Sequence, residues 1–264
     1  MQLINCRKYA REILDDIKNI PNKRGLWILS MGNNPASESY IKGKIRDCEY
    51  CGIPYAPIKV VSEELLTDFI EGGNKNPDVA GIIVQLPLPD GIDETPYTQA
   101  IAPEKDVDGF TPNSHFKPCT PEAVMYILKC ELGEQNLSGK RALIIGRGNL
   151  VGKPLIQMLL DADCTVTVAH SKTTNLDELL GQADIIVSAV GKPRLVDLKK
   201  CRAMIVIDVG ICRTSDGLLT GDCYNYVETG DGMKVTSVPG GIGLMTRAML
   251  MQHTADAGRQ VDRR

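Results

Sequence analysis

The sequence predicts an α/β protein with two domains, each built on a parallel sheet. Three observations support this prediction. Short apolar runs alternate with helical segments along the chain, as in βαβ units. One such run, residues 81–84 (GIIV), is continuously apolar, as strands buried on both faces of a parallel sheet are. The strand–helix series also starts twice, at residue 25 and at residue 141, with a polar, glycine-containing segment before the second start.

The first series has a βαβαβ order. Residues 25–31 read as a strand, and residues 37–52 read as a helix that ends at its glycine. Residues 56–61 and 79–85 are further strands, separated by a helix at residues 65–71. This order predicts a parallel, twisted sheet with right-handed crossovers.

The second series follows a helix that we expect to start with Thr120 as N-cap and Pro121 at its first position. That helix should run to about Leu132, and residues 133–140 should form a loop. The expected elements after it are strands at 142–145, 165–169, 185–190 and 204–209, a helix at 154–162, and a final helix at 245–259. We expect the final helix to return to the first domain. The domains would then comprise residues 1–116 with about 243–264, and residues 117–242, joined near 116–120.

Composition limits the classes of partner. The 264 residues are 43% hydrophobic and carry a net charge of −3, which is ordinary for a soluble globular protein and gives no reason to expect nucleic acid or a membrane surface as partner. No apolar run approaches the roughly 20 residues that span a bilayer. The N-terminal segment is charged and helical in pattern, without the apolar centre of a signal peptide. Nine scattered cysteines fit a reducing compartment, so we expect a cytoplasmic protein.

Cys48 and Cys51 have the C-x-x-C spacing of some metal and redox sites. No second pair of ligands follows at zinc-site distance, and both residues fall in a predicted helix. We therefore expect buried thiols rather than a metal site.

The end of the strand at residues 79–85 is a candidate site. Gln85 places an amide there, and the following Leu86-Pro87-Leu88-Pro89 must leave the sheet because proline cannot continue a central ladder. Ligands of open α/β sheets bind where strands end. Asp106 and Asp108 follow in an acid-rich turn before Gly109, where they could bind a ligand or only fix the turn.

Tyr40 and Lys44 are four residues apart in a predicted helix and so share one face. Tyrosine can stack on a planar ligand, and lysine can act as acid and base where burial favours its neutral form. Gln85 could hold that amine, and Asp108 could accept hydrogen bonds from the N–H edge of a ligand. The alternative is that Tyr40 and Lys44 are solvent-exposed helix residues without a functional role.

A second candidate site begins where the strand at residues 142–145 runs into GRGNLVGKPL (146–155). A strand, a glycine turn and a helix start form the context of a phosphate-binding turn, because glycines let the backbone approach a pyrophosphate and the helix N-terminus supplies N–H groups. The spacing, G-x-G-x-x-x-G, is one residue longer than the usual fingerprint. A tight turn that merely needs small residues is the alternative.

The end of the next strand indicates which dinucleotide would bind. An NAD site usually has Asp or Glu there, but this chain has His170, Ser171 and Lys172. Arg147, Ser171 and Lys172 could all bind a 2′-phosphate, so we favour NADP. Alternatively, His170 could only form hydrogen bonds at the end of the strand, and Ser171 and Lys172 could belong to a solvated loop.

Taken together, these segments resemble the bifunctional methylenetetrahydrofolate dehydrogenase/cyclohydrolase family over nearly the whole chain. The motifs that carry the resemblance are SESYIKGK (37–44), GIIVQLPLP (81–89), PEKDVDGF (103–110), GRGNLVGKPL (146–155), HSKT (170–173) and VPGGIGLMT (238–246). VQLPLP and KDVDGF are highly specific to that family.

The resemblance implies a catalytic folate domain, a Rossmann-type NADP domain and a homodimer formed through the latter. It implies that Lys44 is the acid/base of the cyclohydrolase step, Gln85 positions it, Tyr40 stacks on the folate and Asp108 anchors the pterin. The implied cofactor contacts are Gly146, Arg147, Gly148, Val151, Gly152, His170, Ser171, Val190, Gly191 and Ile211. The implied folate contacts are Tyr40, Gln85, Leu86, Pro87, Asp108, Pro239, Gly240 and Gly241, and no metal is implied.

Three departures from the family pattern concern the dehydrogenase half. Gly148 stands where the family usually has serine, and Ser237 and Leu244 replace prolines near the PGG turn. The alternatives are therefore a cyclohydrolase with weakened dehydrogenase activity, a non-catalytic folate- or nucleotide-binding paralogue, and an amino-acid or shikimate-type dehydrogenase. The last has no reason to carry VQLPLP or KDVDGF, and the intact Lys44 argues against the paralogue.

Overall fold

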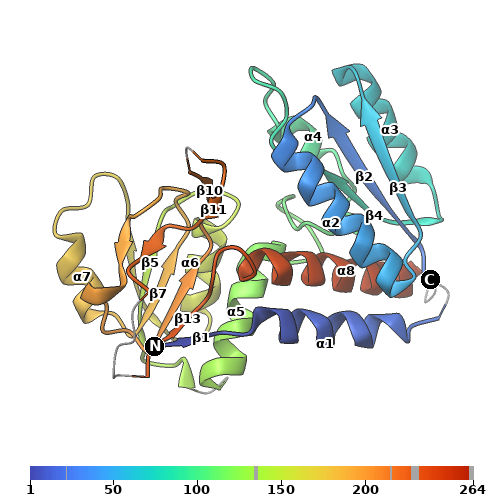
Figure 1. Ribbon diagram of the computed structural model, residues 1–264. Helices are drawn as coiled ribbons and strands as arrows, with labels where there is room; N and C mark the ends of the chain where they lie inside the picture. Colours follow the sequence, from blue (N-terminus) through green and yellow to red (C-terminus); the bar gives the residue numbers. More distant parts are fainter. Residues whose placement is uncertain (22, 134–135, 215, 227–231, 262–264) are drawn as a thin grey trace. The chain divides into compact units, whose positions relative to one another are not determined.

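The computed structural model describes residues 1–21, 23–133, 136–214, 216–226 and 232–261. These fall into two compact units, which Figure 1 shows coloured along the sequence. Unit 1 comprises Met1–Tyr9 and Thr120–Thr246, and unit 2 comprises Ala10–Cys119 and Arg247–Arg264. The boundaries fall inside three helices: α1 (Cys6–Lys18), α5 (Cys119–Leu132) and α8 (Ile242–Val261).

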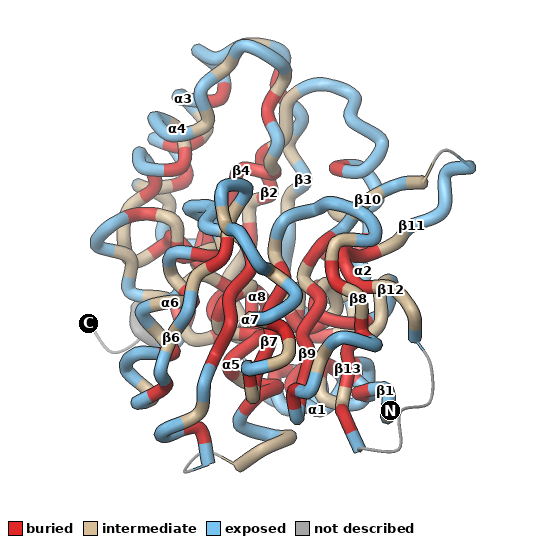
Figure 2. The backbone as a smooth tube through the Cα atoms, turned by 90° about the vertical axis from the view of Figure 1, so that its left-hand side faces the viewer, coloured by how far each residue is buried: buried red, intermediate tan, exposed pale blue. Residues whose placement is uncertain are grey.

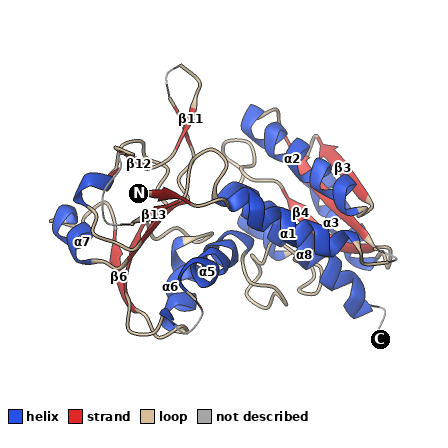
Figure 3. Cartoon of the chain, turned by 60° about the horizontal axis from the view of Figure 1, so that its bottom comes forward, coloured by secondary structure: helices blue, strands red, loops and turns tan. Residues whose placement is uncertain are grey.

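Unit 2 contains a three-stranded parallel sheet in the order β3-β2-β4. The strands are β2 (Gly25–Met31), β3 (Tyr55–Val60) and β4 (Val79–Val84). Its helices include α2 (Pro35–Cys51), α3 (Glu63–Lys75) and the short α4 (Thr95–Gln99), and Figure 3 shows α2 and α3 beside the strands. Every residue of β4 is buried, as its continuous apolar run predicts.

Helix α2 starts two residues earlier than expected because Asn34 caps it. The Asn34 side chain accepts hydrogen bonds from the N–H groups of Ala36 and Ser37, and Pro35 takes the first helical position. Gly52 ends the helix in the left-handed conformation, as predicted.

Helix α8 belongs to unit 2 from Arg247 onward, in line with our expectation that the final helix returns to the first domain. Met251 on α8 contacts Cys48 on α2, with 3.5 Å between the two sulfur atoms. The core beneath the sheet contains Leu29, Leu66 and Ile82, all fully buried.

Unit 1 contains a six-stranded sheet in the order β1-β13-β9-β7-β5-β6, and all five neighbouring pairs are parallel. Its strands are β1 (Gln2–Leu3), β5 (Arg141–Ile145), β6 (Thr165–Ala169), β7 (Ile185–Ser188), β9 (Ile205–Asp208) and β13 (Lys234–Val235). In Figure 2 the central strands β7 and β9 are buried along their length. The two parallel sheets with their helices confirm the predicted α/β class.

The remaining elements of unit 1 are short. They are α6 (Gly152–Leu160), α7 (Leu176–Gln182), β8 (Val196–Asp197), η2 (Leu198–Lys200), β10 (Cys212–Arg213), β11 (Leu219–Thr220) and β12 (Cys223–Tyr224). Strands β8 and β12 pair in parallel, and β10 and β11 form an antiparallel ribbon.

Other parts of unit 1 also differ from the sequence-based expectations or lie outside the described residues. Strand β1 pairs with β13 in the sheet of unit 1, although we assigned residues 1–116 to the other domain. Helix α5 begins at Cys119, so Thr120 lies within its first turn and its hydroxyl contacts that of Thr246 at 3.1 Å. Of the expected loop at 133–140, residues 134 and 135 lie outside the described parts of the chain.

Candidate functional site

Lys44 and Gln85 meet in a buried hydrogen bond. Lys44 lies on α2 and Gln85 follows the last residue of β4, and the Lys44 Nζ donates to Gln85 Oε1 at 3.1 Å. The two residues are only 7% and 9% exposed. The Gln85 N–H donates to the carbonyl of Leu29 and its Nε2 donates to the carbonyl of Leu86, so both backbone and side chain are fixed. The amide oxygen is thereby held toward the lysine amine.

Asp108 carries a perturbed carboxyl group. Burial raises its pKa, the positive charges of Lys44 and His253 lower it, and the neighbouring Asp106 raises it further. The charge of Lys44 is thus near enough to Asp108 to affect its pKa. The carboxyl group is held in an environment that favours its protonated form more than water does.

Asp106 has the structural role that we considered for both acids. Its carboxylate accepts from the N–H groups of Gly109 at 3.0 Å and Thr111 at 2.7 Å, and the residue is 1% exposed. A Cβ atom on Gly109 would lie 2.5 Å from the Lys117 carbonyl, so this tight turn requires glycine. Asp106 thus builds the turn that presents Asp108.

Tyr40 lies on α2 beside a charged pair that sequence reasoning missed. Burial raises the pKa of Tyr40, and the nearby Arg247 opposes the shift. Arg247 Nε lies 2.6 Å from Asp47 Oδ2. A Cβ atom on Gly43 would lie 2.7 Å from Arg247 Nη1, so the glycine in the SYIKGK segment leaves room for the guanidinium. Gly43 was the only local sign in this segment that another group packs closely against α2. The sequence could not identify that group, because Arg247 is 204 positions away (Gly43 to Arg247).

His253 was also missed. Its Nδ1 donates to the carbonyl of Val107 at 2.9 Å, and its ring stacks on Phe116 with 4.8 Å between centroids. His253 is buried on α8 directly beside the segment that carries Asp108. Nothing local in the sequence pairs this histidine with the acid-rich turn.

Leu86 and Pro87, the other expected folate contacts in unit 2, are joined by a cis peptide bond. Pro87 is exposed and Leu86 is partly buried. The Ser37 hydroxyl donates to the Leu86 carbonyl at 3.5 Å, which links this turn to α2.

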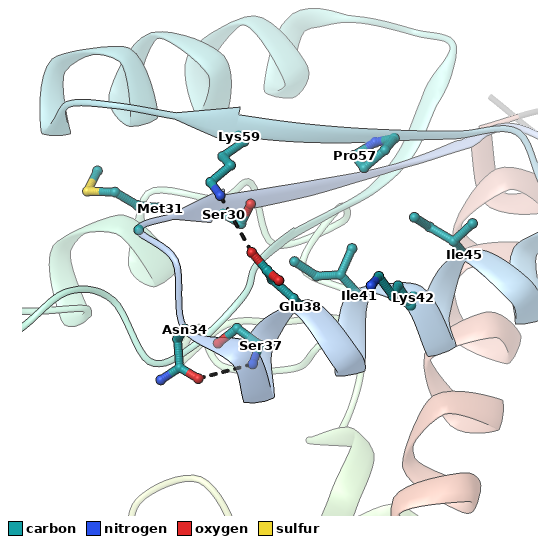
Figure 4. A pocket seen from close by; sticks show the side chains of 11 residues that line it. Ser30, Met31, Asn34, Ser37, Glu38, Ile41, Lys42, Ile45, Pro57 and Lys59 are labelled. Atoms are coloured by element: carbon teal, nitrogen blue, oxygen red, sulfur yellow. Dashed lines mark hydrogen bonds and ion pairs between the residues drawn. The ribbon is translucent and has the colours of Figure 1, made fainter.

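A hollow of about 270 Å³ lies along a neighbouring face of α2 (Figure 4). Ile41, Ile45 and Pro57 form its apolar wall. Glu38 and Lys59 form an ion pair across it at 3.8 Å. Tyr40, Lys44, Gln85 and Asp108 do not line this hollow, so it is separate from the predicted site.

The glycine turn of unit 1 uses its three glycines differently. A Cβ atom on Gly146, whose φ is 110°, would lie 2.5 Å from the carbonyl oxygen of Ala189. A Cβ atom on Gly152 would lie 2.4 Å from the carbonyl oxygen of Gly146. Both positions therefore require glycine, whereas nothing lies within 4 Å of a Cβ atom on Gly148. Helix α6 begins two residues earlier than expected, with Val151 at its N-cap position but no side-chain capping hydrogen bond.

Arg147 and Ser171 follow adjacent strands. β5 and β6 pair up to Ile145 and Ala169, and the Gly146 N–H donates to the Ala169 carbonyl at 2.9 Å. Arg147 and Ser171 are both exposed just beyond this last pair. The His170 Nδ1 accepts from the Lys172 N–H at 3.1 Å, so the ring of His170 fixes the turn.

The other predicted cofactor residues lie at the same edge of the sheet. Val190 and Gly191 follow β7, and Ile211 follows β9; Val190 and Ile211 are 46% and 45% exposed. Pro239, Gly240 and Gly241 follow β13, the neighbour of β9, and a Cβ atom on Gly241 would lie 2.2 Å from the Ser237 carbonyl oxygen. Five neighbouring strands thus end in predicted site residues, as expected for ligand binding at the carboxyl edge of a parallel sheet.

Cys48 and Cys51 are fully buried, and burial raises their pKa values to about 12 and about 11. Such thiols are unreactive at neutral pH. Within the described ranges there is no group of three or more His, Cys, Asp or Glu residues arranged to hold a metal ion. No helix in those ranges is both long and apolar enough to cross a bilayer.

These features define a two-unit α/β protein with a dinucleotide-type turn in one unit and a buried lysine–amide pair in the other. The catalytic-domain model of the tetrahydrofolate dehydrogenase/cyclohydrolase family matches residues 4–108, and its NAD(P)-binding-domain model matches residues 118–262. The chain belongs to this family. Membership removes the shikimate-type alternative.

Relatives and solved structures agree over nearly the full length. The bifunctional protein FolD of Anaeromyxobacter dehalogenans is 42% identical over 90% of this chain and 89% of its own. FolD of Lactococcus lactis is also 42% identical, over 92% and 90%. The crystal structure of the FolD methylenetetrahydrofolate dehydrogenase/cyclohydrolase from Campylobacter jejuni is 36% identical, covers 98% of this chain and 99% of its own, and has a TM-score of 0.89. The Trypanosoma brucei enzyme, solved with NADP cofactor and an inhibitor, is 29% identical with a TM-score of 0.89, and covers 99% of this chain and 98% of its own.

Proposed function

We propose that the chain oxidises 5,10-methylenetetrahydrofolate to 5,10-methenyltetrahydrofolate with NADP⁺, and hydrolyses the product to 10-formyltetrahydrofolate. The observation that carries the proposal is the buried hydrogen bond between Lys44 and Gln85 at the end of β4, in a chain of this family. A buried amine fixed beside an amide and near a carboxyl group is suited to moving a proton.

In the hydrolytic step, water adds to the methenyl carbon and one carbon–nitrogen bond then opens, with net release of one proton. Lys44 transfers protons in this step, and Gln85 holds its amine in place. Tyr40 offers a ring for stacking on the folate. Asp108 binds the N–H edge of the pterin, because a carboxyl group can pair with an amino-pyrimidine edge.

In the oxidative step, the C–H bond of the methylene carbon breaks and a hydride passes to NADP⁺. This step needs chiefly the correct placement of two rings. Gly146 and Gly152 allow the backbone to approach the pyrophosphate at the start of α6. Arg147 and Ser171, exposed beyond the ends of β5 and β6, bind the 2′-phosphate and favour NADP over NAD.

Gly148 supports a second candidate, a cyclohydrolase with a weakened dehydrogenase. Because no side chain stands at this position, the turn lacks a hydroxyl that could reach a phosphate. A coupled absorbance assay with methylenetetrahydrofolate and either NADP⁺ or NAD⁺, followed by methenyl hydrolysis without cofactor, separates the two candidates. Hydrolysis without reduction favours the second, and neither activity favours a non-catalytic paralogue.

Lys44→Met tests the assigned acid/base directly. We expect cyclohydrolase turnover to fall by about 10²–10⁴-fold, the usual contribution of general acid–base catalysis. Lys42→Met is the matched control, since Lys42 is an exposed lysine on the same helix, and it should keep the parent rate. A Lys44→Met protein that folds and retains the parent rate would remove Lys44 from this role.

We also propose a cytoplasmic homodimer that forms through unit 1. Support comes from the family resemblance and from β6, an edge strand whose only described partner is β5. Light scattering on the purified protein should give twice the 28.8 kDa mass of the chain; a single chain mass at micromolar concentration would contradict the dimer.

A further inference from the structure

Two buried carboxylates, Asp208 and Asp222, lie at the carboxyl edge of the unit 1 sheet, and no sequence motif marks either of them. Asp208 is the last residue of β9 and is 1% exposed, while Asp222 immediately precedes β12 and is fully buried. Buried carboxylates are costly unless they accept several hydrogen bonds. Their partners therefore indicate what they hold in place.

Asp222 holds the loop that follows β7. Its Oδ2 accepts from the Ser188 hydroxyl at 2.7 Å and from the Val190 N–H at 2.9 Å, and its Oδ1 accepts from the Lys192 N–H at 2.7 Å. These three donors bracket Gly191, which has a φ of 74°. One carboxylate thus fixes the backbone on both sides of the predicted cofactor residues Val190 and Gly191.

Asp208 holds the neighbouring loop and Asp222 itself. Its Oδ1 accepts from the N–H groups of Gly210 at 3.0 Å and Asp222 at 3.1 Å, and its Oδ2 accepts from the Cys223 N–H at 2.8 Å. The bond to Gly210 fixes the backbone immediately before Ile211. The loops after β7 and β9 are therefore connected through one chain of hydrogen bonds that passes through Asp222 and Asp208.

Two glycines make room for these carboxylates. A Cβ atom on Gly210 would lie 2.2 Å from Asp222 Oδ1, and a Cβ atom on Gly221 would lie 2.1 Å from Asp208 Oδ2. No larger residue fits at either position without displacing a carboxylate. The exposed apolar side chains of Val190 and Ile211 stand on the two loops that this arrangement fixes.

We propose that Asp222 and Asp208 are positioning residues of the dehydrogenase half, which hold the loops after β7 and β9 in the conformation that receives the nicotinamide end of NADP. This inference rests on the proposed cofactor site. Neither carboxylate touches the cofactor; both act through the backbone of Val190, Lys192 and Gly210. Cyclohydrolase activity, which uses no nucleotide, should be independent of them.

Asp222→Asn is the decisive variant because it preserves size. The amide replaces one acceptor oxygen by a donor, so at least one of the Val190 and Lys192 N–H groups loses its partner. We expect the Kd of NADP⁺, measured by calorimetry, and the KM of NADP⁺ to rise about ten-fold or more, as the loss of a buried hydrogen bond predicts. Cyclohydrolase kcat and KM should stay at parent values.

Asp184→Asn is the matched control. Asp184 lies at the opposite end of β7, where it pairs with Arg141 at 3.0 Å. This variant should bind NADP⁺ like the parent. Asp208→Asn should also weaken NADP⁺ binding. The double variant should lose less binding free energy than the two single variants lose in sum, because Asp208 orients the Asp222 backbone.

Unchanged NADP⁺ binding in a folded Asp222→Asn protein would overturn the inference. The inference would also be overturned if dehydrogenase activity, cyclohydrolase activity and the folded fraction all fell together. That result would mean that Asp222 only stabilises the fold. Because the primary measurement is binding, it remains informative if the proposed oxidation itself fails. A parent chain that binds no NADP⁺ would overturn the cofactor site and this inference together.

Discussion

Among single residues, Gly148 is the departure from the family pattern whose surroundings the structure describes best. Its φ lies outside the left-handed region, and a Cβ atom there would meet nothing within 4 Å. We expect Gly148→Ser to lower the KM of NADP⁺ by about ten-fold, because a hydrogen bond to a charged phosphate contributes roughly 1.5–3 kcal/mol. Steady-state dehydrogenase kinetics will measure this change.

Gly148→Ala is the control for the hydroxyl, since it adds the Cβ atom alone. It should leave the KM close to that of the parent. An equal improvement in both variants would attribute the gain to a stiffer turn and not to a new phosphate contact.

Asp108 gives a prediction about pH. Because burial raises its pKa above the ordinary value of 3.8, the folded chain holds this proton more tightly than the unfolded chain. The stabilisation is complete below 3.8 and is lost as pH rises through the higher, folded-state pKa. Asp108→Asn cannot ionise, so its stability relative to the parent should increase as pH rises from about 4 toward neutrality.

Urea unfolding of both proteins across this pH range measures the difference. Asp184→Asn should show the opposite pH dependence. In the parent, the hydrogen bond with Arg141 lowers the pKa of Asp184, so the variant should become less stable relative to the parent as pH rises. A pH-independent difference between Asp108→Asn and the parent would show that the carboxyl group is not desolvated. Asp108→Asn should also raise the KM of methenyltetrahydrofolate through weaker pterin binding.

Whether a residue of the candidate site could be predicted depends on how far its partners lie along the sequence. Tyr40 and Lys44 could be placed on one helix face from their spacing alone, and Gln85 could be placed at a strand end from the prolines that follow it. Arg247, His253 and Asp222 could not, because each meets its partners through contacts with segments far away in the sequence. Local patterns contain no information about such pairs.

At the scale of elements, the glycine turn before α6 combines a required glycine with a free one. A Cβ atom on Gly152 would lie 2.4 Å from the carbonyl oxygen of Gly146, which is backbone and cannot move aside cheaply. We expect Gly152→Ala to displace the start of α6, to weaken NADP⁺ binding by ten-fold or more, and to lower the thermal midpoint. Gly148→Ala, four residues earlier in the same turn, should do neither.

Calorimetric binding and thermal unfolding on the two variants test this contrast. Similar losses in both would mean that the turn is sensitive to any added side chain. Retention of binding in Gly152→Ala would mean that the helix start does not approach the cofactor.

Element boundaries were predictable where capping residues act locally. Strand β2 matches its expected bounds, while α2 starts earlier because Asn34 and Pro35 form a stronger start than the one we chose. The two-residue strands, such as β1 and β13, were missed because their identity depends on pairing between distant segments. A run that short has no periodicity of its own.

At the scale of the whole molecule, each unit has its own hydrophobic core. One surrounds Leu143, Ile186 and Val206 in unit 1, and the other surrounds Leu29 and Ile82 in unit 2. The sequence predicted this division through its two βα series, and the division also separates the two proposed chemistries. Lys44 and Gln85 belong to unit 2, and the glycine turn belongs to unit 1.

We therefore expect NADP⁺ to stabilise the two units unequally. A ligand at 100 times its Kd adds about 2.7 kcal/mol to the stability of the part that binds it. Hydrogen exchange with and without NADP⁺ should show slower exchange in β5, β7 and β9, and little change in β2 and β4. Asp222→Asn, compared at the same NADP⁺ concentration, should reduce this protection. Equal slowing in both sheets would instead mean that the two cores unfold as one cooperative unit, so that cofactor binding also rigidifies the lysine site.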